Sequence, residues 1–118
     1  MRSSSGEVAV YNTLVANGMD FEEEYQFDDL TTSKGVPLRF DFAVFDENGD
    51  LDFLIEFNGL QHYRPVNKYG GGKALERQRY NDSRKRVYCA MHKIPLVVIP
   101  YYDEPKISYD YIMSKAGY

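Results

Sequence analysis

The stretch 39–58 limits the fold more than any other part of the chain, because an Asn-Gly pair separates two runs of β-forming residues. The runs are 39–45 (RFDFAVF) and 51–58 (LDFLIEFN). Asn-Gly in this setting is the strongest short signal for a β-hairpin, since a type I′ turn needs positive φ at both central residues. A two-residue loop of Asn48 and Gly49 predicts an antiparallel pair in which the numbers of opposed residues sum to 97.

That register places two carboxylates, Asp41 and Glu56, directly opposite each other. Opposed residues have Cβ atoms about 4.5–5.5 Å apart, and like charges there destabilise a sheet. A divalent cation such as Mg²⁺, which takes carboxylate oxygens, would relieve the repulsion. The other interpretation is an edge pair with both carboxylates in solvent. The cation site is favoured because large apolar residues are expected on the opposite face of the hairpin, namely Phe40, Phe42, Val44, Phe53, Ile55 and Phe57.

Length and composition indicate one intracellular domain. A chain of 118 residues with 43% hydrophobic residues can form one core but not two separate domains. The single Cys89 excludes an internal disulfide and a Cys-rich zinc site. We expect a cytoplasmic protein, since no signal peptide and no membrane-spanning run is apparent. Residues 1–5 are expected to be disordered or derived from an expression vector.

The charge is distributed unevenly along the chain. The net charge is −4, but residues 1–63 carry a net −10 and residues 64–93 a net +7. A basic segment directly after an acidic hairpin could hold a phosphate backbone against a bound metal ion. An ordinary solvated helix face would have the same composition, so charge alone leaves both interpretations open.

The remaining pattern predicts the order αβββαβ followed by a C-terminal helix, which makes an α/β fold with a mixed sheet flanked by helices. Helices are predicted at 6–17, 73–92 and after Pro105, and strands at 21–27, 39–45, 51–58 and 95–101. The last strand reads as buried on both faces. Glycines 70–72 are expected to form a mobile loop. Residues expected to face inward from the second helix are Tyr80, Arg84, Val87, Met91 and Ile94.

Two further residues complete a candidate catalytic site. His62 follows the strand that carries Glu56, at a strand end, where loops often carry catalytic groups. A histidine beside a metal site can act as a general acid or base when a partner fixes its other ring nitrogen, and Asp82 is the best-placed partner. His62 could instead be a metal ligand, and each residue taken singly could be a surface side chain. Gln61 and Lys85 are candidates for substrate contact, although their spacing does not require it.

Together these residues resemble the PD-(D/E)xK nuclease superfamily, whose core is a helix, a three-strand meander, a helix and a strand. Its second strand carries an acid, matched by Asp41, and its third an acid-x-Lys, matched by Glu56-Phe57-Asn58 with Asn58 in place of lysine. In lacking this lysine, the chain resembles the very-short-patch repair endonucleases and the phage-borne EDxHD homing endonucleases. In those enzymes a downstream histidine replaces the lysine. The stretches 55–63 (IEFNGLQHY), 82–85 and 94–101 resemble this branch.

The resemblance implies a restriction-endonuclease-like core over about residues 7–101. Its site residues, in order, would be Glu7, Asp41, Glu56 at the variable position, His62 and Asp82. Asp41 and Glu56 would hold the metal, Glu7 would position a water, and His62, oriented by Asp82, would activate it. Glu7 also has a purely local interpretation, because Ser4 and Glu7 form a capping-box pattern at the start of the first helix.

The activity implied is that of a Mg²⁺-dependent endodeoxyribonuclease, a hydrolase acting on double-stranded DNA, with Mn²⁺ able to substitute. Residues 1–118 would then be the single catalytic domain of a homing endonuclease whose DNA-recognition module lies elsewhere, in a bacterial host. Two alternatives stay open. One is a nuclease fold that has lost catalysis and only binds nucleic acid, with Asn58 as a sign of that loss. The other is a mismatch-specific nicking repair endonuclease, while RNA cleavage is a weaker option.

Overall fold

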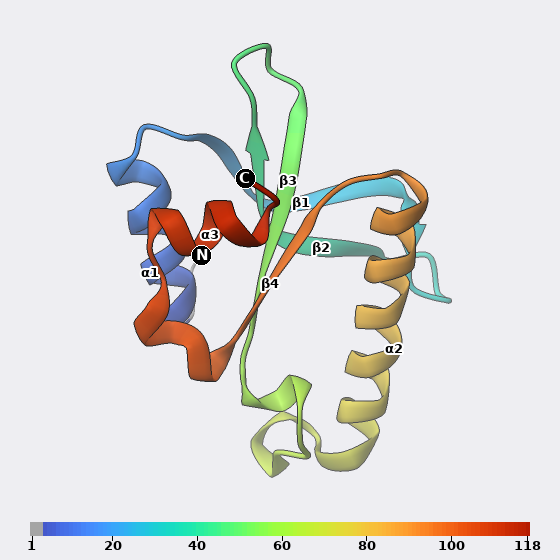
Figure 1. Ribbon diagram of the computed structural model, residues 1–118. Coiled ribbons are helices and arrows are strands. Elements are labelled where there is room, and N and C mark those ends of the chain that lie inside the picture. The colour runs from blue at the N-terminus through green and yellow to red at the C-terminus, as the bar shows by residue number, and fades with distance from the viewer. Residues whose placement is uncertain (1–3) are drawn as a thin grey trace.

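The computed structural model describes residues 4–118, in which three α-helices and four strands follow one another in the predicted order (Figure 1). The helices are α1 (Ser5–Ala16), α2 (Gly71–Met91) and α3 (Tyr109–Lys115). The strands are β1 (Asp20–Thr31), β2 (Pro37–Phe45), β3 (Leu51–Asn58) and β4 (Leu96–Pro100). The short 3₁₀-helices η1 (Leu60–His62) and η2 (Asn67–Tyr69) lead from β3 to α2, and η3 (Tyr101–Lys106) leads from β4 to α3.

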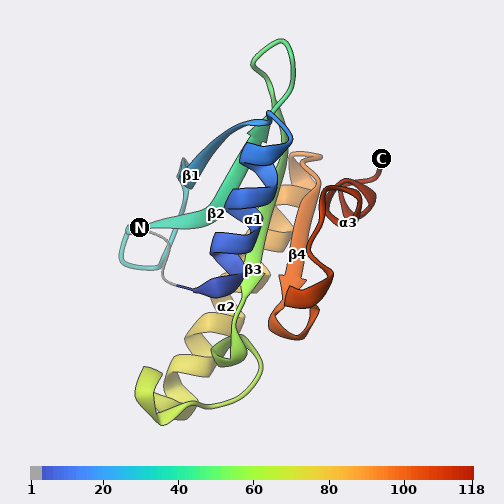
Figure 2. The ribbon, with the colours of Figure 1, turned by 90° about the vertical axis from the view of Figure 1, so that its left-hand side faces the viewer.

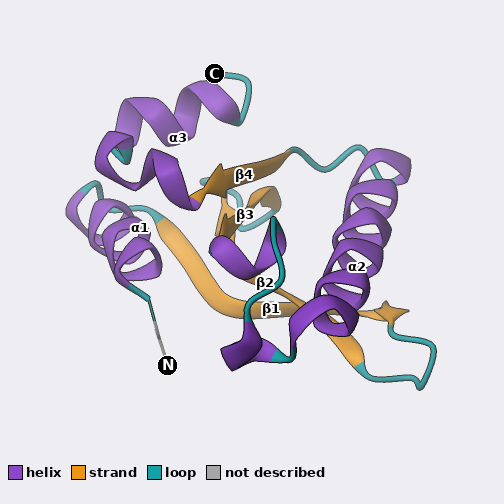
Figure 3. Ribbon diagram, turned by 90° about the horizontal axis from the view of Figure 1, so that it is seen from below, coloured by secondary structure: helices purple, strands orange, loops and turns teal. Residues whose placement is uncertain are grey.

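The strands form one mixed sheet in the order β1-β2-β3-β4, antiparallel from β1 to β3 and parallel between β3 and β4. Helix α2 makes the crossover between the parallel pair and covers one face of the sheet, while α1 and α3 cover the other (Figures 2 and 3). The predicted α/β class with a mixed, helix-flanked sheet is confirmed, and β2 and β3 are its central strands. The prediction that the last strand is buried on both faces is wrong, because β4 is an edge strand whose buried residues are Val97 and Ile99.

The β2–β3 hairpin has the predicted register but not the predicted turn. Phe42 pairs with Ile55 and Val44 with Phe53, and both pairs sum to 97. The turn is a longer one, since the Gly49 amide donates to the Asp46 carbonyl and the Asp46 amide to the Asp50 carbonyl. Gly49 has φ 81° and Asn48 does not have positive φ, which excludes a type I′ turn. A register shift beside the turn then restores the predicted pairing.

The side-chain alternation of β2 breaks at Asp41. Phe42 and Val44 pack against the α1 and α3 side of the sheet, whereas Phe40 packs on the α2 side with Ala43 and Leu54. The prediction that Phe40 shares a face with Phe42 is therefore wrong. The neighbouring strand β1 has an irregularity at the same level, where Glu24 has φ 56°, a left-handed value that is uncommon for a residue other than glycine.

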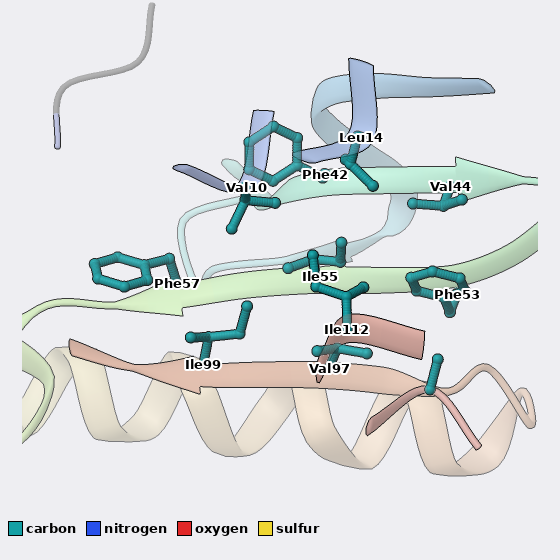
Figure 4. Packing of buried hydrophobic residues seen from close by; sticks show 11 residues of the cluster. Val10, Leu14, Phe42, Val44, Phe53, Ile55, Phe57, Val97, Ile99 and Ile112 are labelled. Atoms are coloured by element: carbon teal, nitrogen blue, oxygen red, sulfur yellow. The ribbon is translucent and has the colours of Figure 1, made fainter. Parts of the chain in front are cut away.

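The larger apolar core lies between the sheet and helices α1 and α3 (Figure 4). Its largest fully buried side chains are Phe42 and Phe53, which Leu14 of α1 and Ile112 of α3 cover. Helix α1 begins as predicted, because Ser4 is its N-cap and accepts a hydrogen bond from the Glu7 amide. Of the tail expected over residues 1–5, Ser4 and Ser5 thus belong to this helix and its cap, and residues 1–3 lie outside the described residues.

Helix α2 turns a different face to the sheet from the one that its apolar residues predict. Tyr80, Val87 and Met91 are exposed, while Lys85 and Cys89 are buried. The predicted inward stripe is therefore wrong for Tyr80, Val87 and Met91, because the sheet opposite this helix offers a carboxylate as well as apolar groups. Ile94, just after the helix, is partly buried against the apolar cluster on this face, as predicted. The prediction that glycines 70–72 form a loop is also wrong. Gly70 caps α2 with φ 98° and Gly71 begins the helix with φ 67°, so these glycines turn the chain sharply into the helix.

Among the described residues, no helix has the length and apolar character needed to cross a lipid bilayer.

Candidate active site

Asp41 and Glu56 meet at the point where the β2–β3 backbone pairing ends. The last backbone pair is Phe42 with Ile55, and the next position places Asp41 beside Glu56 as predicted. There each carboxylate bonds the opposite strand, since the Asp41 amide donates to Glu56 Oε1 at 3.1 Å and the Phe57 amide donates to Asp41 Oδ2 at 2.8 Å. The two acidic side chains are thereby fixed between the strands by the backbone itself.

The pair is electrostatically costly. Burial and the neighbouring Glu56 carboxylate raise the pKa of Asp41 from 3.8 to about 8, although the Phe57 amide and Lys85 act in the opposite direction. Burial also raises the pKa of Glu56, which is only 5% exposed. Two carboxyl groups that resist ionisation together are typical of a site that gains stability from a cation.

Lys85 supplies the positive charge that partly offsets this cost. Its Nζ lies 3.0 Å from Glu56 Oε2, and both side chains are buried. The ammonium also lies 5.3 Å from the centre of the Phe40 ring. Both Glu56 oxygens are therefore occupied, Oε1 by a backbone amide and Oε2 by Lys85.

His62 and Asp82 form the hydrogen-bonded pair that the sequence predicts. His62 Nδ1 lies 2.9 Å from Asp82 Oδ2, and the second oxygen, Oδ1, accepts a hydrogen bond from Gln78 at 3.0 Å. Burial acts to raise the pKa of Asp82, but the hydrogen bonds and the charge of His62 outweigh it and lower that pKa. Asp82 thus stays ionised and holds the imidazole through Nδ1, which leaves Nε2 for other partners.

Glu7 reaches the site from the other side of the sheet. Its carboxylate lies near enough to raise the pKa of Asp41, and it accepts a hydrogen bond from the Ser4 hydroxyl at 3.0 Å. The preceding Gly6 is buried against Phe57, and any side chain there would overlap the Phe57 ring. Glycine at this position lets the first turn of α1 approach the end of β3, so Glu7 combines its local bond to Ser4 with a place beside Asp41.

A cleft of about 450 Å³ lies between α2 and the end of the sheet, and Asp41 and Glu7 lie outside its lining. Its walls include Glu56, His62, Asp82 and Lys85, together with the exposed side chains of Arg79 and Arg86. Asn58 also lines it, and its Oδ1 is buried without a hydrogen-bond partner. The cleft therefore joins an acidic floor to a basic rim, which suits a phosphate group beside a cation.

The donor set fits Mg²⁺ or Mn²⁺ at Asp41 and Glu56. Mg²⁺ commonly takes one or two protein carboxylates and keeps several waters, and this pair supplies two hard oxygen donors that repel each other without a cation. Within residues 4–118, no three His, Cys, Asp or Glu side chains are gathered as a ready-made metal cage. His62 is held by Asp82 rather than turned toward the two carboxylates through Nδ1.

All five predicted site residues lie in or beside this region, and the residue that the sequence undervalued is Lys85. A signal for it was present in α2, where Gln78, Asp82, Lys85 and Cys89 follow one another at spacings of three and four residues, as on one helix face. Polar residues on an inward face were not expected, and only Glu56, distant in sequence, explains the burial of this lysine.

Comparison with known proteins adds no relative to this description, since no protein-family model, curated protein or solved structure significantly matches the chain.

Proposed function

We propose that this chain is a metal-dependent DNA endonuclease domain, the catalytic domain of a phage-type homing endonuclease with a restriction-endonuclease-like core, and that it hydrolyses phosphodiester bonds in double-stranded DNA. The observation that carries the proposal is the cleft that the His62–Asp82 pair and Glu56 line together. Glu56 in turn accepts a hydrogen bond from the Asp41 amide. General-base, cation-binding and phosphate-binding groups are all present there within one small domain.

The chain's own residues divide the work of hydrolysis. Asp41 and Glu56 would hold Mg²⁺ or Mn²⁺, and the cation, when bound, supplies charge neutralisation at the phosphate and a more acidic water. His62 accepts the proton of the attacking water at Nε2, because Asp82 occupies Nδ1. Asp82 fixes the ring and stabilises the imidazolium that forms. Glu7 orients a water next to Asp41 from the first turn of α1.

The basic rim positions the DNA backbone. Arg79 and Arg86 line the cleft with exposed guanidinium groups, which suit bidentate contacts with phosphate oxygens. Both belong to α2, as do Asp82 and Lys85, so one helix carries the phosphate-binding and the histidine-orienting groups. The acidic N-terminal half of the chain lies mainly outside this helix, which accounts for a DNA-binding surface on a protein of net charge −4.

Cleavage of supercoiled plasmid in the presence of Mg²⁺ tests the proposal. Wild type should convert the plasmid to nicked or linear forms, and His62→Ala should reduce the rate by about 10²–10⁴, the usual contribution of a general base. Lys34→Met, which removes an exposed charge in the β1–β2 turn, is the matched control and should cleave at the wild-type rate.

If wild type cuts no better than His62→Ala on any duplex offered, the enzymatic proposal fails. Retention of DNA in a gel shift under those conditions would then favour the non-catalytic, nucleic-acid-binding alternative. Nicks confined to mismatched duplexes would favour the repair alternative, whereas breaks at a specific site in matched duplex DNA would favour a homing endonuclease.

A further inference from the structure

We propose that Lys85 is an internal counter-ion that takes the place of the metal at Glu56, and that cation binding moves its ammonium from Glu56 to a phosphate oxygen in the cleft. The inference rests on the proposed function and gives a role to a residue that the mechanism above does not use. Its basis is the 3.0 Å contact between Lys85 Nζ and Glu56 Oε2 inside the cleft wall.

Lys85 and a bound metal ion would compete for one oxygen of Glu56. Glu56 Oε1 is held by the Asp41 amide, a backbone group that is fixed in the sheet, so Oε2 is the oxygen that can change partner. Lys85 occupies it with a single positive charge at the end of a flexible stem. A divalent cation held by Asp41 and Glu56 would carry twice that charge and would need the same region of space, so the two cations would exclude each other at Oε2.

The surroundings of Lys85 decide where its displaced ammonium would go. Lys85 lines the same cleft as His62, and its ammonium lies 5.3 Å from the centre of the Phe40 ring, whose face attracts a cation but offers no oxygen acceptor. Of the neighbouring carboxylates, Asp82 is held through both oxygens by His62 and Gln78, and Asp41, which accepts from the Phe57 amide through Oδ2, would itself hold the metal ion. Two acceptors in the cleft are then open to an ammonium released from Glu56, the unpartnered Asn58 Oδ1 and an anion that enters, and the anion is preferred because it carries the opposite charge.

A lysine suits this position better than an arginine. A lysine is a compact point charge with freely rotating donors, and it can leave one acceptor for another by turning its stem. An arginine would grip Glu56 through two parallel hydrogen bonds and release it less readily. Replacing Lys85 by an uncharged side chain or by arginine should thus shift metal affinity in opposite directions.

Calorimetric titration with Mn²⁺ tests the inference on the folded domain. Lys85→Met should bind Mn²⁺ about tenfold more tightly than wild type, because the competing charge is gone, while Lys85→Arg should bind it more weakly. At saturating Mn²⁺, Lys85→Met should cleave plasmid at least about 100-fold more slowly, because the phosphate has lost a donor. Lys34→Met, the exposed control, should leave both quantities unchanged.

The inference would be overturned if Lys85→Met and Lys85→Arg changed the affinity for Mn²⁺ in the same direction, or if Lys85→Met cleaved plasmid at the wild-type rate. Lys85→Arg keeps the charge and the fold, so weaker Mn²⁺ binding by this variant supports the inference even if Lys85→Met does not fold, and unchanged or tighter binding overturns it. If wild type binds Mn²⁺ but cuts no DNA, the proposed function fails, while opposite shifts in affinity still support the counter-ion role. If wild type binds no Mn²⁺, binding gained by Lys85→Met supports the role, and its absence there overturns it.

Discussion

The two faces of the sheet differ in what they bury. Within residues 4–118, the face toward α1 and α3 buries an apolar cluster with Phe42, Phe53 and Ile55 at its centre. The face toward α2 has a smaller apolar cluster around Phe40 and Leu54, and directly beside it Glu56 and Lys85 are buried as an ion pair. The same two strands, β2 and β3, contribute to both faces, so the difference arises from side-chain direction rather than from separate elements.

This contrast indicates a division between stability and chemistry. Buried charges are expensive even when paired, and replacing such pairs by apolar residues often stabilises a protein. A small domain can retain them only if another region supplies the stability, and the apolar core under α1 and α3 does so here. Predictions that separate the two faces therefore test the description directly.

The largest effect on stability is expected from the apolar face. Phe53→Ala should lower the free energy of unfolding by about 3–5 kcal/mol, because it leaves a cavity in the centre of that core. Urea denaturation followed by circular dichroism measures the change. Plasmid cleavage per folded molecule should stay at the wild-type level, and a loss of cleavage by the folded fraction would contradict the separation of the two faces.

The next effect concerns the buried acid. The raised pKa of Asp41 means that the folded protein binds this proton more tightly than the unfolded chain, so the stability it contributes is present below about pH 4 and is lost as the pH rises through about 8. Asp41→Asn should therefore stabilise the metal-free protein at pH 9 by a few kcal/mol, since each pKa unit corresponds to about 1.4 kcal/mol.

Urea denaturation at pH 5 and pH 9, with chelator present, measures that difference. The gain from Asp41→Asn should be much smaller at pH 5, where wild type already carries the proton. A variant that is less stable than wild type at pH 9 would show that Asp41 is ionised at little cost.

A smaller coupling energy is expected between His62 and Asp82. Because Asp82 acts through the ring of His62, the double variant His62→Ala/Asp82→Ala should cleave about as slowly as His62→Ala alone. The coupling in a double-mutant cycle should reach about 2 kcal/mol, within the usual range for contacting residues. Rates that multiply independently would show that the hydrogen bond has no part in catalysis.

The smallest effect should come from the edge of the α2 face. The Tyr88 hydroxyl donates to Asp29 Oδ1 at 2.7 Å and ties α2 to β1. Tyr88→Phe should cost about 0.5–1.5 kcal/mol, the net value of one hydrogen bond. Thermal unfolding measures this, with Lys34→Met as the exposed control. A cost as large as that of Phe53→Ala would mean that the α2 face carries more of the stability than its composition indicates.

Sequence patterns predicted the elements well because each one repeats a local signal. The order of helices and strands followed from periodicity and from turn residues, and the Asp41–Glu56 neighbourhood followed from counting along the hairpin. That count was right although the turn was wrong. The longer turn at Asp46–Asp50 and the register shift beside it compensate each other, and local rules predict neither.

The missed features depend on contacts between distant parts of the chain. Phe40 lies on the other face from Phe42, and the left-handed Glu24 is at the same level of the adjacent strand, an irregularity that local pattern rules do not predict. The inward face of α2 was misassigned because Lys85 is buried only through its contact with Glu56, whereas Val87 and Met91, which look like core residues, are exposed. Periodicity reports only where apolar residues recur along the sequence, so it cannot identify a helix face that is buried through its charged residues.

Calorimetric titration of Asp41→Asn and wild type with Mn²⁺ tests the central claim most directly, because it asks whether the acidic end of the hairpin is a cation site at all. The two proteins differ by one carboxylate oxygen, and the hydrogen bond from the Phe57 amide can be kept by the asparagine oxygen. We predict saturable binding of Mn²⁺ by wild type and its loss in Asp41→Asn. Equal binding by the two proteins, or none by wild type, would contradict the account.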